Sequence, residues 1–210
     1  MIKPVVARLW FAATALVVFV GLVVQLVVTA RLDSGYFDSR AGRIANVFCF
    51  FTIQSNIIVM VTCAMLAVRV ARKPTWFWVL RLDGVLCISV TFLVFHVALS
   101  DLHELSGGAA VADFLLHTAS PILCVVGWVA FGPRRKTSTR IGLLSTLFPL
   151  AWLAFTLVRG PLAGDFYPYP FLDVGVHGYP TVLLNCAVVA LVFLGLAAGA
   201  HQLDRRLPRR

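Results

Sequence analysis

The stretch Ile44–Val70, IANVFCFFTIQSNIIVMVTCAMLAVRV, is apolar enough to cross a membrane, yet it carries a compact polar cluster. The cluster consists of Thr52, Gln54, Ser55 and Asn56. A polar group in the hydrocarbon region of a bilayer costs free energy unless it finds a partner or faces a wet cavity, so such groups commonly mark functional sites. The stretch therefore predicts a membrane helix and places a candidate functional site on it.

The composition of the whole chain agrees with a membrane protein. Of the 210 residues, 60% are hydrophobic and 13% are charged, whereas soluble domains average about half and about a quarter. The mean hydropathy is +0.91. The net charge of +9 does not indicate a nucleic-acid partner, because the basic residues lie in short clusters between the apolar runs, where they set topology.

Five further apolar runs approach the length of about 20 residues that a helix needs to cross a hydrocarbon core about 30 Å thick. With the stretch quoted above, six membrane helices are expected: Leu9–Ala30, Ile44–Val70, Trp76–Leu99, Val111–Phe131, Ile141–Val158 and Tyr179–Leu203. No repeat, low-complexity segment or linker separates them, so residues 1–210 are expected to form one domain. The expected fold class is all-α, a polytopic bundle of six transmembrane helices.

The distribution of the lysines and arginines predicts the orientation. Fourteen lie on one side of the membrane and four on the other, and the side richer in positive charge is normally cytoplasmic. Both termini are therefore expected in the cytoplasm. The fourteen are Lys3, Arg8, Arg69, Arg72, Lys73, Arg81, Arg134, Arg135, Lys136, Arg140, Arg205, Arg206, Arg209 and Arg210, and the four are Arg31, Arg40, Arg43 and Arg159.

The cysteines do not predict a metal site. All of them lie inside apolar runs, and no CxxC pair or mixed Cys/His spacing typical of metal ligands occurs. They are interpreted as small packing residues, and neither a metal nor a cofactor is expected. The five are Cys49, Cys63, Cys87, Cys124 and Cys186.

Polar side chains from several helices are predicted at one depth in the outer half of the bilayer. Thr52 lies eight residues from the outer end of its run, and His117 and Asn185 lie six residues from theirs. With a rise of about 1.5 Å per residue, these depths are roughly 12, 9 and 9 Å. Trp152 falls in the same layer and His96 slightly above it. We expect a pocket there, with the Thr52 hydroxyl within a hydrogen bond or one bridging water of a His117 ring nitrogen.

Pro121 predicts an irregular turn beside His117. Proline has no amide hydrogen, so the carbonyl of His117, four residues earlier, is expected to lose its helical partner. The helix should bend at this point and open space beside the imidazole.

The last outer loop, residues 160–178, is long and rich in proline and aromatic residues. An apolar loop of this length is better buried than exposed. It is therefore expected to close the pocket from the outside as a lid, with Tyr167, Tyr169 and Phe171 facing inward.

Four short motifs resemble, in order and spacing, a family of six-helix membrane proteins, the androgen-induced and androgen-dependent TFPI-regulating proteins and their bacterial relatives. The resemblance covers most of the chain and implies a six-helix plan with both ends inside. For a bacterial relative it implies a place in the plasma membrane. The motifs are Phe50-x-Thr52, Leu116-His117-Thr118-Ala119-Ser120-Pro121, Tyr169-Pro170-Phe171-Leu172 and Leu184-Asn185.

The eukaryotic members of that family are threonine hydrolases that cleave fatty acid esters of hydroxy fatty acids. The resemblance implies that Thr52 is the nucleophile and His117 its base, acting on a lipid ester. Attack on the ester carbonyl would give an acyl-threonine, and water entering from the outer face would complete hydrolysis. Further residues expected to bind the substrate or its developing oxyanion are Gln54, Ser55, Asn56, His96, Trp152, Tyr169 and Asn185.

Other interpretations of the same residues remain open at this stage. Threonine, asparagine and glutamine in membrane helices often only bond to carbonyls or bridge helices, which would suit a non-catalytic lipid-binding protein or a small transporter. His96 and His117 could also serve as axial ligands of a haem in an electron-transfer protein. The sequence leaves the oligomeric state open.

Overall fold

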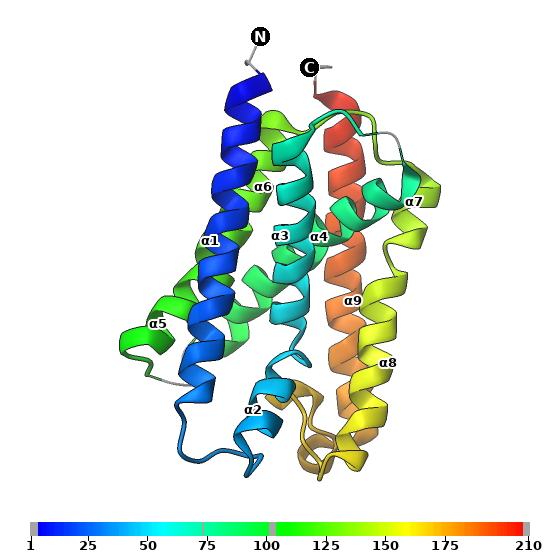
Figure 1. Cartoon of the computed structure of the whole chain (residues 1–210). Helices are drawn as coiled ribbons and strands as arrows, with labels where there is room; N and C mark the ends of the chain where they lie inside the picture. Colours follow the sequence, from blue (N-terminus) through cyan, green and yellow to red (C-terminus); the bar gives the residue numbers. More distant parts are fainter. Residues whose placement is uncertain (1–3, 73, 101–103, 208–210) are drawn as a thin grey trace.

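The computed structural model describes residues 4–72, 74–100 and 104–207. This part of the chain is helical and contains no strand, which confirms the all-α membrane bundle (Figure 1). Lys3, Lys73, Arg209 and Arg210, four of the charges in the topology count, lie outside the described residues. Six helical spans are long and apolar enough to cross a membrane: Pro4–Ala30, Phe51–Val68, Thr75–Leu99, Gly107–Phe131, Thr139–Leu162 and Val174–Arg206.

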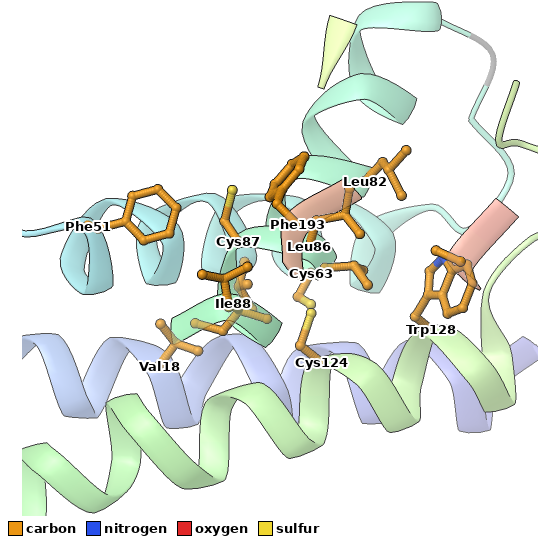
Figure 2. Close-up of a cluster of buried hydrophobic side chains, with 14 of the residues drawn as sticks. Val18, Phe51, Cys63, Leu82, Leu86, Cys87, Ile88, Cys124, Trp128 and Phe193 are labelled. Carbon is orange, nitrogen blue, oxygen red and sulfur yellow. The ribbon is translucent and has the colours of Figure 1, made fainter. Parts of the chain in front are cut away.

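The core lies where four helices meet: α1 (Pro4–Ala30), α3 (Phe51–Val68), α4 (Thr75–Val94) and α6 (Ser120–Phe131). Figure 2 shows buried side chains converging from these helices and from the last helix, α9 (Val174–Arg206). The cysteines contribute to this packing as expected: Cys63, Cys87 and Cys124 are buried, and Cys49 and Cys186 are partly buried.

Two charged side chains of α4, Arg81 and Asp83, are also buried. Arg81 is 3% exposed, and its guanidinium contacts the sulfur of Cys63 at 3.4 Å and that of Cys124 at 3.5 Å. The two sulfurs lie close together in Figure 2.

The two chain ends lie at the same end of the bundle, and α2 (Arg40–Val47) lies at the other end (Figure 1). At the end that holds the termini, the Asp204 carboxylate of α9 accepts hydrogen bonds from the backbone N–H groups of Arg135, Lys136 and Thr137 at 2.8–3.0 Å. This carboxylate fastens the loop after α6 to the last helix.

The second predicted helix, Ile44–Val70, is wrong as a single element. The chain leaves the helix after α2 and resumes it in α3, and Phe50 is extended, with φ −74° and ψ 135°. Thr52 therefore lies in the first turn of a helix instead of deep inside one.

Side chains stabilise this break by binding the carbonyls that it releases. The Gln54 amide donates to the carbonyl of Phe48 and the Trp152 indole donates to the carbonyl of Cys49, both at 2.9 Å. A buried carbonyl needs such a partner. Because Trp152 is remote in sequence, the apolar run alone did not reveal the break.

The fourth predicted helix, Val111–Phe131, begins earlier and is irregular where Pro121 predicted it. It consists of α5 (Gly107–Phe114), a π-helical turn (Leu115–Ala119) and α6. In a π turn each backbone N–H bonds to the carbonyl five residues earlier. Pro121 has no N–H, so the carbonyl that it leaves without a partner is that of Leu116. The Asn56 side-chain amide donates to this carbonyl at 3.1 Å. The carbonyl deprived of its helical partner is thus that of Leu116, not His117.

The last two predicted helices extend beyond their expected bounds. The span predicted as Ile141–Val158 is divided into α7 (Thr139–Leu144) and α8 (Leu147–Leu162). In α9 the backbone departs from helical geometry at Gly178, with φ 70° and ψ 157°. This left-handed position suits glycine, which has no Cβ, and it lies directly before the predicted helix start.

Candidate functional site

Thr52 is buried in the first turn of α3, where its hydroxyl and backbone N–H together make three hydrogen-bond contacts. Its hydroxyl oxygen lies 3.2 Å from His117 Nε2 and 3.2 Å from the Tyr169 hydroxyl. Its backbone N–H has no acceptor within its own helix and donates to the Tyr169 hydroxyl at 3.1 Å. The predicted contact between Thr52 and His117 is therefore present as a direct hydrogen bond.

The π turn presents the His117 ring to Thr52, and two neighbours fix the ring's orientation. Nδ1 lies 2.9 Å from Asp113 Oδ1 and 3.2 Å from the Asp113 backbone carbonyl. Both partners accept, so Nδ1 carries the hydrogen and Nε2 is free to accept from Thr52. The ring also stacks on Phe95, with centroids 4.1 Å apart and planes 12° from parallel.

Asp113 was missed by the sequence reasoning, although a signal was present. It is the only acidic residue within the apolar run Val111–Phe131, and it precedes His117 by four residues. Residues at that spacing share one face of a helix. An acidic side chain in that position could have been identified as a partner for the imidazole.

A cavity of about 310 Å³ opens beside Thr52 and His117. Its walls come from α3, α4, α8, α9 and the residues before α9, and they are almost entirely aliphatic or aromatic. Leu150 of α8 and Leu194 of α9 line it and are 58% and 54% exposed. These residues indicate that the cavity reaches the lipid-facing surface between α8 and α9.

The lid loop, residues 163–173, lies at the end of the bundle opposite the termini (Figure 1). Tyr169 and Phe171 line the cavity, with their rings stacked at a centroid distance of 5.6 Å. The Asn185 amide donates to the Phe171 carbonyl at 2.9 Å and so fastens the loop to α9. The expected inward position of these two rings is confirmed.

Tyr167 also packs inward, but against α8 and not into the cavity. Its ring fills the space beside Gly160, where a Cβ atom would lie 2.3 Å from the ring carbons. The absence of a side chain at Gly160 creates this slot.

Among the other residues proposed to bind substrate, Trp152 lines the cavity, whereas Gln54, Ser55, Asn56, His96 and Asn185 do not. Each of these five side chains makes at least one hydrogen bond to the protein itself. Ser55 bonds to the Thr52 carbonyl and to Thr91, and His96 contacts the Phe92 carbonyl and Thr118.

Asn56 connects the two halves of the site. It is fully buried, and its amide donates to the carbonyl of Thr52 at 2.8 Å as well as to that of Leu116. It thereby joins the turn that carries the hydroxyl to the turn that carries the imidazole.

No protein-family model, curated protein or solved structure matches this chain.

Proposed function

We propose that this protein is a membrane-embedded ester hydrolase in which Thr52 is the nucleophile and His117 the general base. The observation that carries the proposal is the continuous hydrogen-bonded series from Thr52 through His117 to Asp113, at 3.2 and 2.9 Å, beside an apolar cavity. A nucleophile, a base and a group that orients the base are the parts that acyl transfer needs. The family resemblance leads to the same assignment for Thr52 and His117.

Each residue has a defined role in this reaction. His117 Nε2 takes the proton from the Thr52 hydroxyl as the oxygen attacks the ester carbonyl. Asp113 keeps the proton on Nδ1 and stabilises the imidazolium that forms. The imidazolium then gives its proton to the leaving alcohol, which leaves an acyl-threonine. A water molecule activated by the same imidazole attacks the acyl group and regenerates Thr52.

The cavity favours a lipid ester as substrate. Burying an acyl chain against aliphatic walls stabilises the complex by about 25 cal/mol for each Å² removed from water. A lipid could enter sideways between α8 and α9, and water could arrive past the lid loop. This scheme places the protein in the plasma membrane with both termini in the cytoplasm, as the distribution of basic residues favours.

The test is covalent labelling of the purified protein in detergent with a fluorophosphonate probe, followed by hydrolysis of p-nitrophenyl fatty acid esters. The wild type should be labelled on Thr52 and should turn over, and both activities should be lost in Thr52→Ala and His117→Ala. Thr118→Ala is the matched control, because this hydroxyl lies one residue from His117 and contacts His96 instead. Equal labelling of Thr52→Ala and the wild type would refute the assignment.

A non-catalytic lipid-binding protein is the second candidate, because the cavity is apolar and needs no reactive threonine to hold a chain. In that case the wild type and Thr52→Ala would both retain lipid through purification, and neither would be labelled or hydrolyse an ester.

A further inference from the structure

Tyr169 is the polar group of the lid loop that touches the reacting atoms. Its hydroxyl lies 3.2 Å from Thr52 Oγ1 and 3.1 Å from the Thr52 backbone nitrogen. No other side chain of that loop has a hydrogen bond to Thr52 or His117 among the described residues. The proposed roles of Thr52, His117 and Asp113 leave this hydroxyl without a function.

The directions of the hydrogen bonds follow from the donors present. The Thr52 hydroxyl has one hydrogen, which goes to His117 Nε2 if His117 is the base. The Tyr169 oxygen accepts from the Thr52 N–H, so its own hydrogen is directed to Thr52 Oγ1. Tyr169 is therefore a donor that points at the oxygen whose attack creates negative charge nearby.

We propose that Tyr169 is a catalytic residue that donates a hydrogen bond to the oxyanion formed when Thr52 attacks, together with the Thr52 backbone N–H. This inference rests on the proposed hydrolase function. A carbonyl carbon bonded to Thr52 Oγ1 would hold its oxygen next to both donors. The tyrosine would keep its proton and redirect its hydrogen bond from Oγ1 to the oxyanion. The threonine proton goes to His117, so no further reactant is needed.

The surroundings of Tyr169 suit a preorganised donor. The N–H groups at the start of α3 carry partial positive charge that favours an anion. Burial raises the pKa of the Tyr169 hydroxyl above its usual value, so the hydroxyl keeps its proton at neutral pH.

Packing holds the ring where the donor is needed. It stacks on Phe171, meets Phe50 edge to face at a centroid distance of 5.9 Å and contacts Trp152 at the same distance. The ring therefore need not move during the reaction, and only the hydroxyl hydrogen and the Thr52 N–H change their acceptor.

Because Tyr169 belongs to the lid loop, closure of the loop would complete the catalytic site as well as cover it. A lipid could then enter with the loop displaced and react only when the loop has returned. The rate of acylation would depend on the lid through one hydroxyl group.

The test compares Tyr169→Phe with Tyr167→Phe in the purified full-length protein. Each variant removes one hydroxyl from the same loop, but Tyr167 packs beside Gly160 and makes no contact with Thr52. We expect Tyr169→Phe to lower kcat by about 10²- to 10³-fold, the usual effect of deleting one oxyanion donor, with KM nearly unchanged. Tyr167→Phe should keep kcat within about twofold, and thermal unfolding should show that both variants are folded.

The outcomes separate this inference from the proposed function. If Thr52→Ala is inactive and Tyr169→Phe keeps the wild-type kcat, Tyr169 is not an oxyanion donor and only this inference fails. A faster Tyr169→Phe would also overturn it, because the hydroxyl would then be blocking the oxyanion position. If the wild type is inactive, or Thr52→Ala retains full activity, the hydrolase proposal itself fails.

Discussion

Replacing Asn56 with leucine should impair the proposed catalysis while leaving the protein folded. Asn56 is fully buried and its amide reaches two backbone carbonyls. Thr52 O also accepts from Ser55, whereas Leu116 O depends on Asn56 because Pro121 has no amide hydrogen. The substitution keeps the branched shape and the number of side-chain heavy atoms, but leucine is larger than asparagine and lacks the donor to the turn that carries the imidazole.

The expected stability follows from two opposing terms at this position. Leaving the Leu116 carbonyl without a donor costs about 1–3 kcal/mol. The Asn56 side-chain oxygen, however, is buried and accepts no hydrogen bond from the described part of the chain, and removing such a group returns a similar amount, about 1–3 kcal/mol. These two terms nearly cancel, so the free energy of unfolding should fall by about 1–3 kcal/mol, the cost of fitting the larger leucine side chain into a packed position. Asn56→Asp replaces the amide donor with a second oxygen, which would face the two carbonyls, and it adds a buried charge. It should therefore lower the free energy of unfolding by about 3 kcal/mol or more.

Activity should respond differently from stability. Without the link between the two turns, the Thr52 hydroxyl and the imidazole should lose alignment, and a shift of about 1 Å can lower a rate about 100-fold. We expect kcat of Asn56→Leu to fall about 10- to 100-fold for p-nitrophenyl esters. Ser55→Ala, which removes a bond to the same Thr52 carbonyl, should stay near the wild type.

Thermal unfolding in detergent and initial rates per folded molecule measure the two quantities. Full activity of Asn56→Leu would refute the idea that this amide aligns the site. A stable Asn56→Asp combined with an unfolded Asn56→Leu would show that Asn56 does not donate to these two carbonyls.

Four further predictions concern separate parts of the molecule. Asp113→Asn should keep the fold and lower kcat about 10- to 100-fold, less than for a fully buried triad carboxylate, because the Asp113 side chain is 24% exposed. Ala190→Trp should fill the cavity and shift kcat/KM from hexadecanoyl towards butanoyl esters, whereas Ala187→Trp, which lies outside the cavity lining, should not. Asp204→Asn should lower Tm through a loss of about 1–3 kcal/mol and leave kcat per folded molecule unchanged. A phosphatase reporter fused to the C-terminus should be inactive, and an active fusion would reverse the proposed orientation.

The sequence was sufficient to predict the six spans because hydropathy alone decides whether a long helix is stable in a bilayer. It also placed Thr52 and His117 together, since residues at equal depth in neighbouring helices can meet. The break before α3 was not predictable in this way. No proline or glycine marks it, and its carbonyls depend partly on Trp152, a donor about one hundred positions away in the chain.

The functions of the other polar residues could not be assigned from spacing either. Asn56 and Gln54 share the polar cluster with Thr52, yet their amides bind backbone carbonyls. Whether a buried amide faces a ligand or a carbonyl depends on local backbone geometry, which the π turn and the helix break both alter. Asp113, in contrast, could have been identified as a partner of His117 from the sequence alone, because it precedes His117 by four residues.

The π turn at Leu115–Ala119 makes the site depend on the number of residues in the helix as well as on their identity. Deleting Ala119 would allow the span to close into a regular α-helix. The regular turn would absorb the lost residue, so α5 and α6 would keep nearly the same relative orientation. The residues within the turn, His117 among them, would instead point in a different direction. A sequence alignment that accepts a one-residue gap at this position would therefore equate proteins whose imidazoles point in different directions.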